Sequence, residues 1–368
     1  MKKILIVLSS LNIGGAEARM TDVVKNLPEG KYQVDFISMD ESPNQFFERE
    51  LKIIGANITK IAPPRCNALF SHYKELKKII GKCNYDAVHA NTSYHSGFVV
   101  LAAKKYGVKV RIVHSRTTDY GRRSLVNTIA AVVGKLLINM CATDRLAISR
   151  ASGEFLFGKK KDVLVLPNAF DLKTYFSDTA EKENKLKRKY ELDGCTVVGN
   201  VGRFVASKNQ KFAIDIFKEF LKQKPDSKLI FVGDGETFAE VKEYAKTAGL
   251  SEKIVFLGSR DDVYLWMKIF DVLVFPSEYE GLGNVAIEAQ AAGTPCVCSE
   301  AVPHEVDMEL GLVSFMSLSE NAEKWCDEVV EMYSCNRPAK ELIRENFDKR
   351  KYTIESEVKQ LSEIYSRT

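Results

Sequence analysis

Short runs of apolar, mostly β-branched residues recur along the first half of the chain, with helix-like stretches between them. Nearly every position within a run is apolar, a pattern typical of parallel strands that helices cover on both faces. The runs are ILIVL (4–8), VDFIS (34–38), AVHAN (87–91), VRIVH (110–114), RLAIS (145–149) and VLVLPN (163–168). They predict a first doubly wound parallel sheet.

A second series of the same kind begins near residue 195. Between the two series, residues 171–192 are highly charged and carry almost no strand pattern, so they predict a linker and a surface helix. The second series consists of CTVVGNVG (195–202), KLIFVGDG (228–235), KIVFLGS (253–259), DVLVFPS (271–277) and PCVCS (295–299). The chain repeats its architecture without repeating its sequence, which predicts a second α/β domain with a Rossmann-like sheet.

The length of 368 residues also favours two domains, because a single core rarely grows beyond about 250 to 300 residues. We expect an N-terminal domain over residues 1–168 and a C-terminal domain over residues 169–347. A ligand-binding cleft is expected between them, since ligand sites often lie where two domains meet. The last helical stretch, from about 348 to 368, is expected to return to the first domain.

Composition restricts the class of protein. Apolar residues make up 45% of the chain and charged residues 28%, as in soluble globular proteins, and no stretch approaches the roughly 20 apolar residues that cross a bilayer. The start, MKKILIVLSSLNIGG, resembles a secretory signal, but its apolar run is short and ends at Asn12, so we interpret it as a first strand. The eight cysteines form no CxxC pair and no metal-ligand cluster, which favours a reducing cytosol.

Positive charge is concentrated in the first half, although the net charge of the whole chain is only +4. Residues 1–168 contain 26 Lys and Arg against 14 Asp and Glu, and acidic residues are in excess in the remainder. A solvated basic face is the simpler explanation, but this asymmetry also suits an anionic membrane or an anionic substrate. Nucleic acid is less favoured because no recognised binding motif accompanies the charge.

The most informative segment is FPSEYEGLGNVAIEAQAAG, residues 275–293. A strand is expected to end at Pro276 and a helix to start near Asn284, which suits an N-cap. The loop between them contains Glu280, Gly281, Leu282 and Gly283. Glycines let backbone N–H groups approach a ligand, and a helix N-terminus favours negative charge, so this loop is expected to hold an anionic or hydroxyl-rich ligand.

Seven residues separate Glu280 on this loop from Glu288 in the expected helix. The spacing allows one carboxylate to contact the sugar of a nucleotide sugar while the other accepts hydrogen bonds from ribose hydroxyls. Taken alone, the spacing is better explained by two solvated glutamates at a helix end. The glycines around them and the AAGTP sequence that follows shift the interpretation towards a donor site.

Together with five other motifs, this segment resembles family 4 of the retaining glycosyltransferases, whose pattern of two glutamates seven residues apart it reproduces. The other motifs match the family in the same order: GGAE (14–17), PNAFD (167–171), GRFVASKNQ (202–210), VGDGE (232–236) and FLGSRDDV (256–263). Among its members, the chain is most similar to bacterial enzymes that build exopolysaccharide or capsule. The resemblance implies the GT-B fold, in which two Rossmann-like domains face a cleft and the second binds a nucleotide-sugar donor.

The resemblance assigns Arg203 and Lys208, on the loop that starts at Gly202, to the diphosphate of the donor. Their charges would also stabilise the departing nucleoside diphosphate, so that neither a metal ion nor a cofactor is needed. An isolated loop Arg or Lys is more often a solvent-exposed charge. The surrounding GRFxxxKN pattern after a buried strand favours the phosphate role.

Two further loops are implied to contact the donor. Backbone groups of Gly258, Ser259 and Arg260 are implied to recognise the base, which is commonly uracil and in some members guanine. Gly14 and Gly15 are implied to approach the donor phosphate and the acceptor from the first domain. No third glycine completes the GxGxxG pattern of a dinucleotide site, so these two glycines alone are weak support for any cofactor.

His114 ends the fourth apolar run, at a position where related enzymes often have a histidine. Many of them have a second histidine two residues later, where this chain has Arg116. Because the carboxyl ends of parallel strands border the ligand crevice, His114 is a candidate for contact with donor or acceptor. A structural role is the alternative, as for most isolated histidines.

The motifs predict an enzyme that transfers a sugar from a nucleoside diphosphate, with UDP favoured over GDP, to an acceptor hydroxyl with retained anomeric configuration. The candidate catalytic residues are Glu280, Arg203, Lys208 and His114, and Glu280 is expected to position the sugar rather than act as a nucleophile. By resemblance, the acceptor is a saccharide linked to polyisoprenyl diphosphate. Two alternatives stay open: a non-catalytic partner of an active transferase, and a sugar-nucleotide epimerase on the same fold.

Such an acceptor lies at the inner face of the cell membrane, so we expect a cytoplasmic protein that binds there peripherally and that salt releases. The contact is expected through basic clusters of the first domain. These are Lys74/Lys77/Lys78/Lys82, Arg122/Arg123 and Lys159/Lys160/Lys161. For the apolar stretch over residues 121–140, packing in the core is favoured over contact with the membrane.

Overall fold

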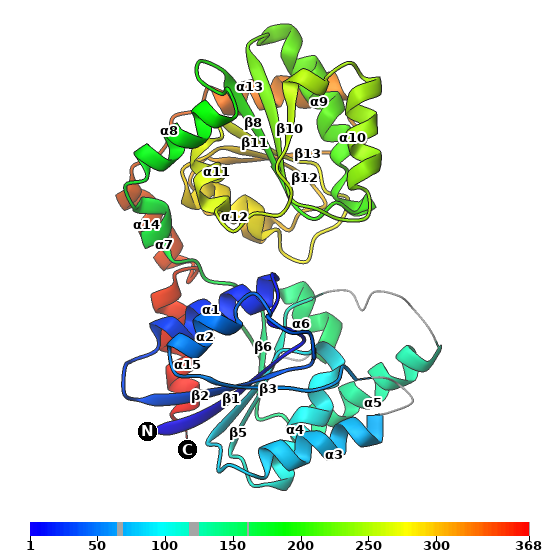
Figure 1. The fold of residues 1–368 in the computed structure, drawn as a ribbon, viewed down its shortest axis with the longest axis vertical. Coiled ribbons are helices and arrows are strands. Elements are labelled where there is room, and N and C mark those ends of the chain that lie inside the picture. The colour runs from blue at the N-terminus through cyan, green and yellow to red at the C-terminus, as the bar shows by residue number, and fades with distance from the viewer. Residues whose placement is uncertain (65–68, 118–124, 160–161, 368) are drawn as a thin grey trace. The chain divides into compact units, whose positions relative to one another are not determined.

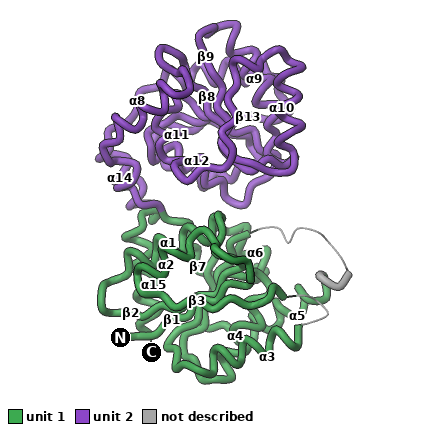
Figure 2. The backbone as a smooth tube through the Cα atoms, viewed as in Figure 1, with its two compact units in different colours: residues 1–169, 351–368 green, residues 170–350 purple. Residues whose placement is uncertain are grey.

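In the computed structural model, the described residues are 1–64, 69–117, 125–159 and 162–367. The chain forms two compact units (Figure 2): unit 1 contains residues 1–169 and 351–368, and unit 2 contains residues 170–350. The boundaries expected from the sequence, after residues 168 and 347, lie one and three residues earlier. Of the basic clusters named above, Arg122/Arg123 and Lys160/Lys161 fall outside the described residues.

Unit 1 is built on a parallel sheet of seven strands in the order β3-β2-β1-β4-β5-β6-β7 (Figure 1). The strands are β1 (Lys2–Leu8), β2 (Tyr32–Ser38), β3 (Asn57–Lys60), β4 (Ala87–Ala90), β5 (Val110–Ser115), β6 (Asp144–Ala147) and β7 (Val163–Val165). The helices are α1 (Gly15–Asn26), α2 (Glu48–Ile53), α3 (Leu69–Ile80), α4 (Ser96–Lys105), α5 (Leu125–Cys141), α6 (Arg150–Phe157) and α15 (Ile354–Tyr365). The strand order reverses between β1 and β4, which places the topological switch point of this sheet there.

The central strand β1 shows why the predicted strands are apolar at nearly every position. Successive side chains of a strand point to opposite faces, and here both faces are covered. Ile6 packs in a core with residues of α1 and α15, whereas Val7 packs in a second core with residues of α3 and α4. Continuous apolarity along β1 therefore reflects burial on both sides of the sheet.

Unit 2 is built on a parallel sheet of six strands in the order β10-β9-β8-β11-β12-β13. The strands are β8 (Thr196–Val201), β9 (Ser227–Val232), β10 (Ile254–Phe256), β11 (Val272–Phe275), β12 (Cys296–Ser299) and β13 (Val313–Met316). The helices are α7 (Leu172–Phe176), α8 (Ala180–Lys189), α9 (Gln210–Gln223), α10 (Phe238–Thr247), α11 (Val263–Ile269), α12 (Asn284–Ala291), α13 (Ala322–Tyr333) and α14 (Lys340–Lys349). The order reverses between β8 and β11, so the switch point of the second sheet lies between these two strands.

Two strands of the sheets were not predicted, and both lie at a sheet edge. In β3, exposed and half-buried residues alternate, and in β13 every residue is half-buried. An edge strand is covered on fewer sides than a central one, and the sequences of these two, NITK and VSFM, are interrupted by polar residues. The two-sheet, Rossmann-like α/β fold itself is confirmed.

The last helix belongs to unit 1, although all of unit 2 precedes it in the sequence. Leu361, Ile364 and Tyr365 of α15 are buried in the same core as Met20 of α1. Within the described ranges, no helix of either unit combines the length and the apolarity that a bilayer crossing requires.

Candidate active site

The loops that follow β8 and β11 flank the switch point of the second sheet, where ligands bind in doubly wound folds. The β8 loop carries Arg203 and Lys208, and the β11 loop carries Glu280. The two loops are joined directly, because the backbone N–H of Glu278 donates to the carbonyl of Ser207 over 2.8 Å. The loops that carry the predicted phosphate-binding and sugar-binding residues are therefore adjacent.

Lys208 and Glu280 form an ion pair between the two loops. Their side chains are 21% and 10% exposed, and the Lys208 ammonium lies 5.7 Å from the centre of the Phe275 ring. Partial burial lowers the dielectric around the pair and strengthens its attraction relative to a surface pair. Glu280 is thus placed to hold the Lys208 ammonium at the site.

Arg203 differs from Lys208 in being exposed, and among the described residues no carboxylate pairs with its guanidinium. Its position is held through the backbone, since Gln210 at the start of α9 donates to the Arg203 carbonyl over 3.0 Å. The loop then turns into α9 through Asn209, whose φ of 54° is left-handed. Arg203 therefore presents an exposed cation on the same loop as Lys208.

Glycines of the neighbouring β9 loop allow backbone to pack against the β8 loop. A Cβ atom on Gly233, whose φ is +138°, would lie 1.9 Å from the carbonyl oxygen of Gly202. A Cβ on Gly235 would lie 2.3 Å from the carbonyl oxygen of Phe204. The glycines of the VGDGE motif are thus required for close packing that shapes the site.

The segment predicted to recognise the base, residues 258–260, lies next to the contact between the β8 and β9 loops. The backbone N–H of Gly233 donates to the Gly258 carbonyl over 2.8 Å, and Gly258 has a left-handed φ of 70°. Ser259 is exposed. The Arg260 guanidinium is held by Asp262, with Nε 2.8 Å from Oδ1, and this hydrogen-bonded carboxylate raises the pKa of Arg260. The Arg260 side chain is therefore already paired, which leaves the backbone of the segment for a ligand.

The β11 loop leads into α12 through Gly283. Its φ is +93°, and a Cβ there would lie 2.9 Å from Val302, so both conformation and space require glycine. The prediction that Asn284 caps the helix was wrong by one residue: Gly283 is the N-cap, and Asn284 is the first helical residue. Before it, Gly281 is half-buried and Leu282 is buried, with Leu282 anchoring the loop to the core.

Glu288 lies in α12 and is half-buried. The side chain of Gln290, a residue of the same helix, holds α12 in place. The sequence did not indicate this role. The buried Gln290 amide donates 2.7 Å to the carbonyl of Val306 and accepts 2.8 Å from the N–H of Met308. These bonds tie α12 to the following segment and set the position of Glu288.

In unit 1, Gly14 and Gly15 lie at the carboxyl end of β1, beside the switch point of the first sheet. Gly14 is the N-cap of α1 in an extended conformation, and α1 begins at Gly15. A Cβ on Gly14 would lie 2.3 Å from a carboxylate oxygen of Glu17. Burial raises the pKa of Glu17, against the attraction of Arg116. Gly14 therefore makes room for a carboxylate that folds back over the start of the helix.

His114 occupies the end of β5, as expected, but its side chain has no exposed surface. Its ring lies parallel to that of His89, with 3.3 Å between His89 Nε2 and His114 Nδ1, and Arg116 Nη2 lies 3.2 Å from the same Nδ1. Burial lowers the pKa of both histidines well below the usual value. The prediction that His114 contacts a substrate therefore has no exposed surface to support it in this structure, because Arg116 and the core enclose the ring.

The contact with Arg116 defines the proton position in His114. Arg116 can only donate, so His114 Nδ1 is an acceptor and His114 carries its proton on Nε2. His89 Nε2 lies 3.3 Å from the same atom, and His89 Nδ1 is hydrogen-bonded to the hydroxyl of Tyr365 over 2.7 Å. Both histidines are neutral and act as fixed elements of a buried network.

Arg116 is the centre of this network, and its role was not predicted. It donates to Asn91 over 2.7 Å and to Asn168 over 2.6 Å, and it lies 4.0 Å from the buried carboxylate of Glu357. These residues come from distant parts of the sequence, so no local pattern could have identified them. Arg116, which stands where many related enzymes have a second histidine, thus links β4, β5, the segment at Asn168 and α15.

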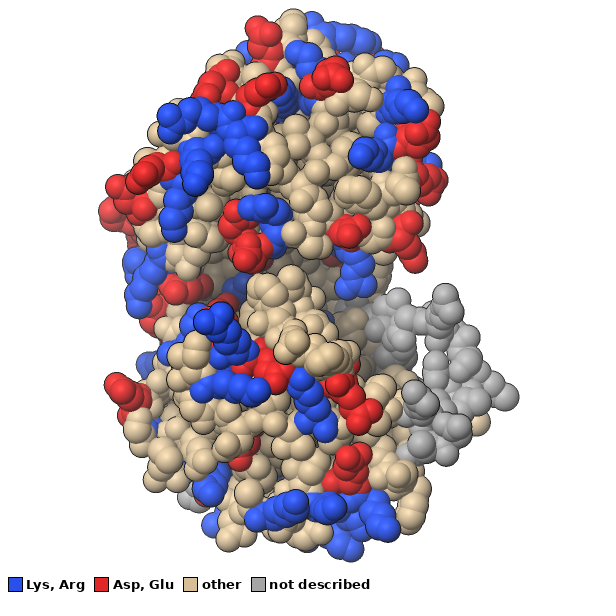
Figure 3. Space-filling view, in the orientation of Figure 1, with Lys and Arg blue, Asp and Glu red and all other residues tan. Residues whose placement is uncertain are grey.

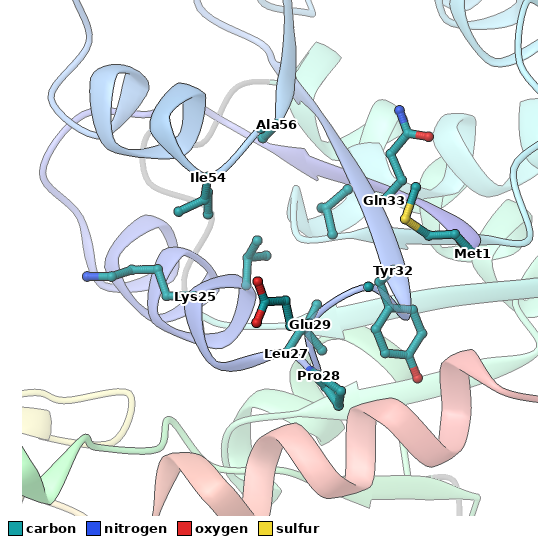
Figure 4. A pocket seen from close by; sticks show the side chains of 13 residues that line it. Met1, Lys25, Leu27, Pro28, Glu29, Tyr32, Gln33, Ile54 and Ala56 are labelled. Atoms are coloured by element: carbon teal, nitrogen blue, oxygen red, sulfur yellow. The ribbon is translucent and has the colours of Figure 1, made fainter.

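The remaining kinds of ligand site are a metal cluster and a cavity. Among the described residues, no group of three or more His, Cys, Asp or Glu is arranged to hold a metal ion. A cavity of about 640 Å³ in unit 1 is lined by Lys25, Glu29, Tyr32 and Gln33, among others (Figure 4). Because Tyr32 and Gln33 begin β2, this cavity lies at the amino ends of the strands, away from the edge at which the predicted ligand residues lie.

Two Rossmann-like parallel sheets, each with glycine-rich loops at its switch point, define the class of proteins with the GT-B fold. Residues 182–346 match the family described as "Glycosyl transferases group 1", and residues 13–174 match "Glycosyltransferase Family 4". The solved structure of Anabaena Alr3699/HepE in complex with UDP-glucose covers 100% of both chains with a TM-score of 0.79 and 21% sequence identity.

The relatives agree with the family matches. EpsF of Bacillus subtilis (strain 168), named as a glycosyltransferase, is 32% identical over 371 residues, which cover 99% of this chain and 96% of EpsF. The capsular polysaccharide biosynthesis glycosyltransferase CapH of Staphylococcus aureus is 28% identical and covers 78% of this chain and 79% of CapH. The UDP-Gal:alpha-D-GlcNAc-diphosphoundecaprenol alpha-1,3-galactosyltransferase of Escherichia coli is 29% identical and covers 71% and 67%. The chain belongs to the family 4 glycosyltransferases, and its relatives include an enzyme named for capsular polysaccharide biosynthesis.

Proposed function

We propose that the protein transfers a sugar from a UDP-sugar to a hydroxyl of a lipid-linked saccharide, with retention of the anomeric configuration. The observation that carries this proposal is the site at the switch point of the second sheet, where Arg203, Lys208 and Glu280 come together on two joined loops. The UDP donor is supported by the name of the Escherichia coli relative and by the UDP-glucose in the Anabaena neighbour.

In this proposal, the two cations of the β8 loop bind the diphosphate. Arg203 is exposed and free to form bonds to phosphate oxygens, while Lys208 is held by Glu280. The N-terminus of α12, behind Gly283, adds backbone N–H groups that favour negative charge. Both features stabilise the charge that develops on the leaving diphosphate, so the reaction proceeds without a metal ion or cofactor.

Other residues bind the rest of the donor. Glu288 accepts hydrogen bonds from the ribose hydroxyls, and the backbone of Gly258 and Ser259 contacts the base. Glu280 orients the sugar while its other oxygen holds Lys208. The loop at Gly14 and Gly15 of unit 1 contributes to the phosphate and acceptor sites.

Transfer then occurs on one face of the sugar. The bond between the anomeric carbon and the diphosphate oxygen breaks, and the acceptor oxygen forms a new bond to the anomeric carbon on the same side. The acceptor proton passes to the departing diphosphate. No enzyme nucleophile takes part, which suits a site made of cations and backbone N–H groups.

The acceptor is proposed to be a saccharide on polyisoprenyl diphosphate, used at the inner surface of the cell membrane. The names of the Escherichia coli and Campylobacter jejuni relatives both include a diphospho-undecaprenol acceptor. The basic first half of the chain supports peripheral attachment to an anionic surface. Lys74 and Lys78 of α3 are exposed and available for such contacts.

A panel of nucleotide sugars tests the proposal. Thermal shift identifies the donor, because a ligand at a hundred times its dissociation constant adds about 2.7 kcal/mol of stability. Transfer is then measured with a diphosphate-linked saccharide acceptor, and proton NMR of the product reports the anomeric configuration. We expect transfer with retention that survives EDTA. Inversion, or complete loss on chelation with recovery on adding Mg²⁺, would refute the mechanism.

The same experiment separates the two alternative functions. A non-catalytic partner would bind a nucleotide sugar without releasing UDP. An epimerase would convert one free nucleotide sugar or sugar into its epimer without an acceptor. The presence of Arg203, Lys208 and Glu280 in one site favours the transferase.

A further inference from the structure

The loop that follows β4 contains a residue with a strained backbone, Ser93. Its φ is +52°, although it is not a glycine, and it begins the short 3₁₀ helix η2 (Ser93–His95) that leads into α4. A left-handed φ is costly for a residue with a Cβ atom, and such strain occurs most often at ligand-binding and active sites. The strain at Ser93 therefore indicates a role for this loop beyond joining β4 to α4.

Close packing keeps the loop in this conformation. Tyr94 is buried, and a Cβ atom on Gly134 of α5 would lie 2.2 Å from the Tyr94 carbonyl oxygen. The backbone N–H of Thr92 donates to Ser96 Oγ over 3.0 Å. The backbone on both sides of Ser93 is thus fixed, so the strain cannot relax.

Three buried polar atoms near this loop have no hydrogen-bond partner among the described residues. They are Ser93 Oγ and His95 Nδ1 of η2, and Nε2 of His72 in α3. Burial and the charge of nearby His72 lower the pKa of His95 to about 4, so the two rings are neighbours. We call these three residues the β4-loop cluster. Because folded proteins satisfy nearly all buried polar groups, three unpartnered atoms in one region indicate groups that bond to a ligand or to ordered water.

The β4-loop cluster lies at the edge of the sheet at which ligands bind. Strand β4 borders the switch point of unit 1, so the loop after it shares this edge with Gly14. Helix α3 runs back towards the amino end of β4, so His72 in its first turn lies at the same edge. Ser93 and His95 are half-buried, so their side chains reach the surface and can turn towards a ligand there.

The chemistry of the cluster favours hydroxyl groups as partners. Burial lowers the pKa of both His72 and His95, so the two rings are neutral at physiological pH. A neutral imidazole has one nitrogen that donates and one that accepts, and the Ser93 hydroxyl does both. Sugar hydroxyls also donate and accept, so they match all three groups.

Two of the lysines of α3 lie at the far end of the helix from the cluster. Lys77 and Lys78 are in its last turn, whereas His72 is in its first. In the view of Figure 3, Lys and Arg side chains gather at the lower edge of unit 1, the region of α3 and α4 in Figure 1. The three groups of the cluster carry no charge themselves, which suits a saccharide better than a phosphate.

We propose that the β4-loop cluster is a subsite for the saccharide part of the acceptor, whose hydroxyls bond to Ser93, His95 and His72. On binding, the side chains of Ser93 and His95 turn towards the sugar, and His72 completes the contact from α3. Because these atoms lack partners beforehand, few hydrogen bonds are broken when the new ones form. The inference rests on the proposed function, since it names residues that recognise the acceptor of that reaction.

Ordered water is the alternative partner for these groups, because it often satisfies buried polar atoms. Water held in this way would make the cluster a contributor to stability rather than to binding. Substitutions separate the two roles. Removing a polar group that bonds only to a ligand leaves the free protein as stable as before or more stable.

The test measures stability and acceptor binding in the same variants of the full chain. The probes are alkyl diphosphates that carry N-acetylglucosamine, N-acetylgalactosamine, glucose or galactose, and the same alkyl diphosphate without a sugar. Ser93→Ala removes the hydroxyl, and His72→Phe/His95→Phe keeps both rings without their nitrogens. By isothermal titration we expect weaker binding of the sugar probes in each variant, by at least about tenfold in the double variant. Stability in urea should be equal or higher, and affinity for UDP unchanged.

Ser362→Ala is the matched control. Ser362 lies in α15 of the same unit, and its Oγ is also buried without a partner among the described residues. This variant should bind every probe as the unmodified protein does. Affinity for the alkyl diphosphate without a sugar should be the same in all variants.

NMR of the unmodified protein gives a second, independent measurement. The chain has five histidines, so their ring nitrogens can be followed individually. The signals of His72 and His95 should shift on addition of a sugar probe and stay in place on addition of UDP.

Sugar-probe affinity that is unchanged in both variants, or histidine signals that respond to none of the sugar probes, would overturn the proposal. Unchanged affinity together with lower stability would assign the groups to ordered water instead. Binding is measured without transfer, so the two proposals fail separately. Sugar probes that bind through the cluster without any transfer would refute only the proposed function, whereas transfer with an unchanged acceptor KM in both variants would refute only this inference.

Discussion

Glu357 of the last helix accepts a hydrogen bond of 3.1 Å from the backbone N–H of Ala169, the last residue of unit 1 before the chain enters unit 2. The carbonyl of Ala169 accepts a second bond, of 2.8 Å, from Arg19 of α1. Both backbone groups at this crossing point are thus held by side chains of unit 1. The chain leaves unit 1 from a fixed position.

Replacing Glu357 by Gln should change how stability depends on pH. Burial raises the pKa of Glu357 from 4.5 to about 7, against the attraction of Arg116. The folded protein holds this proton more tightly than the unfolded chain, so ionisation of Glu357 lowers stability as the pH rises from about 4.5 to about 7. We expect the stability of Glu357→Gln relative to the unmodified protein to improve over this range by as much as about 3 kcal/mol.

Urea unfolding at several pH values measures this difference directly. His89 and His114 titrate in both proteins, with the opposite sign because burial lowers their pKa, so their contribution cancels in the comparison. A difference that stays constant from pH 4.5 to 8 would show that Glu357 is ionised throughout.

Removing either partner of the Lys208–Glu280 ion pair should lower kcat. Lys208→Met removes a charge that stabilises the leaving diphosphate, a loss of about a hundredfold to a thousandfold in comparable sites. Glu280→Gln keeps a hydrogen-bonding group but releases Lys208, so the double variant should be less impaired than the product of the two single effects. The control Lys211→Met disrupts an exposed pair between Lys211 of α9 and Glu240 of α10 and should leave kcat unchanged. Strictly multiplicative effects would argue against a functional unit.

Arg203→Ala should reduce turnover about as much as Lys208→Met does while leaving stability within about 0.5 kcal/mol of the unmodified protein. The reason is that Arg203 is exposed and, among the described residues, has no carboxylate partner to lose. Steady-state rates at saturating donor and urea unfolding give the two values. Normal turnover would remove the phosphate assignment.

Glu288→Gln should weaken the binding of UDP itself by about tenfold, with a smaller effect on kcat. A ribose contact is made equally in the ground state and the transition state, so its loss appears in KM. Isothermal titration with UDP tests this, and Glu243→Gln, an exposed glutamate of α10 in the same unit, serves as control. Equal UDP affinity in both variants would exclude a ribose contact by Glu288.

Gly233→Ala should destabilise unit 2 strongly, since the added Cβ would lie 1.9 Å from the Gly202 carbonyl oxygen. The control is Gly249→Ala, because Gly249 also has a positive φ but nothing within 4 Å of an added Cβ. We expect Gly233→Ala to cost at least about 2 kcal/mol more than Gly249→Ala in urea unfolding. Similar costs would show that the β8 and β9 loops can move apart without loss.

The sheets could be predicted from the sequence because β1 and the other central strands are covered on both faces. Nearly every residue of such a strand is apolar, and this pattern is visible in the sequence. The sequence was also sufficient to bring Lys208 and Glu280 to one site, since both follow strands that flank a switch point. The surroundings of His114 could not be predicted in this way. Its neighbour His89 bonds to Tyr365, which is 276 residues away in the sequence, and neither residue type alone indicates such a contact. The exposure of Ile129, Val132 and Leu136 on α5 was not predicted for a similar reason: an apolar helix sequence does not reveal which of its sides the neighbouring helices leave uncovered.

The return of α15 to unit 1 has a consequence for how the protein is made on the ribosome. Residues 170–350 form one compact unit from a continuous segment, whereas unit 1 needs residues 351–368 to complete its core. Val358, Leu361 and Tyr365 are synthesised after all of unit 2, so the apolar surface that they cover stays open until then. Unit 2 can therefore reach its native state during translation, and the first half of the chain waits for the last helix, a period in which chaperones would protect it.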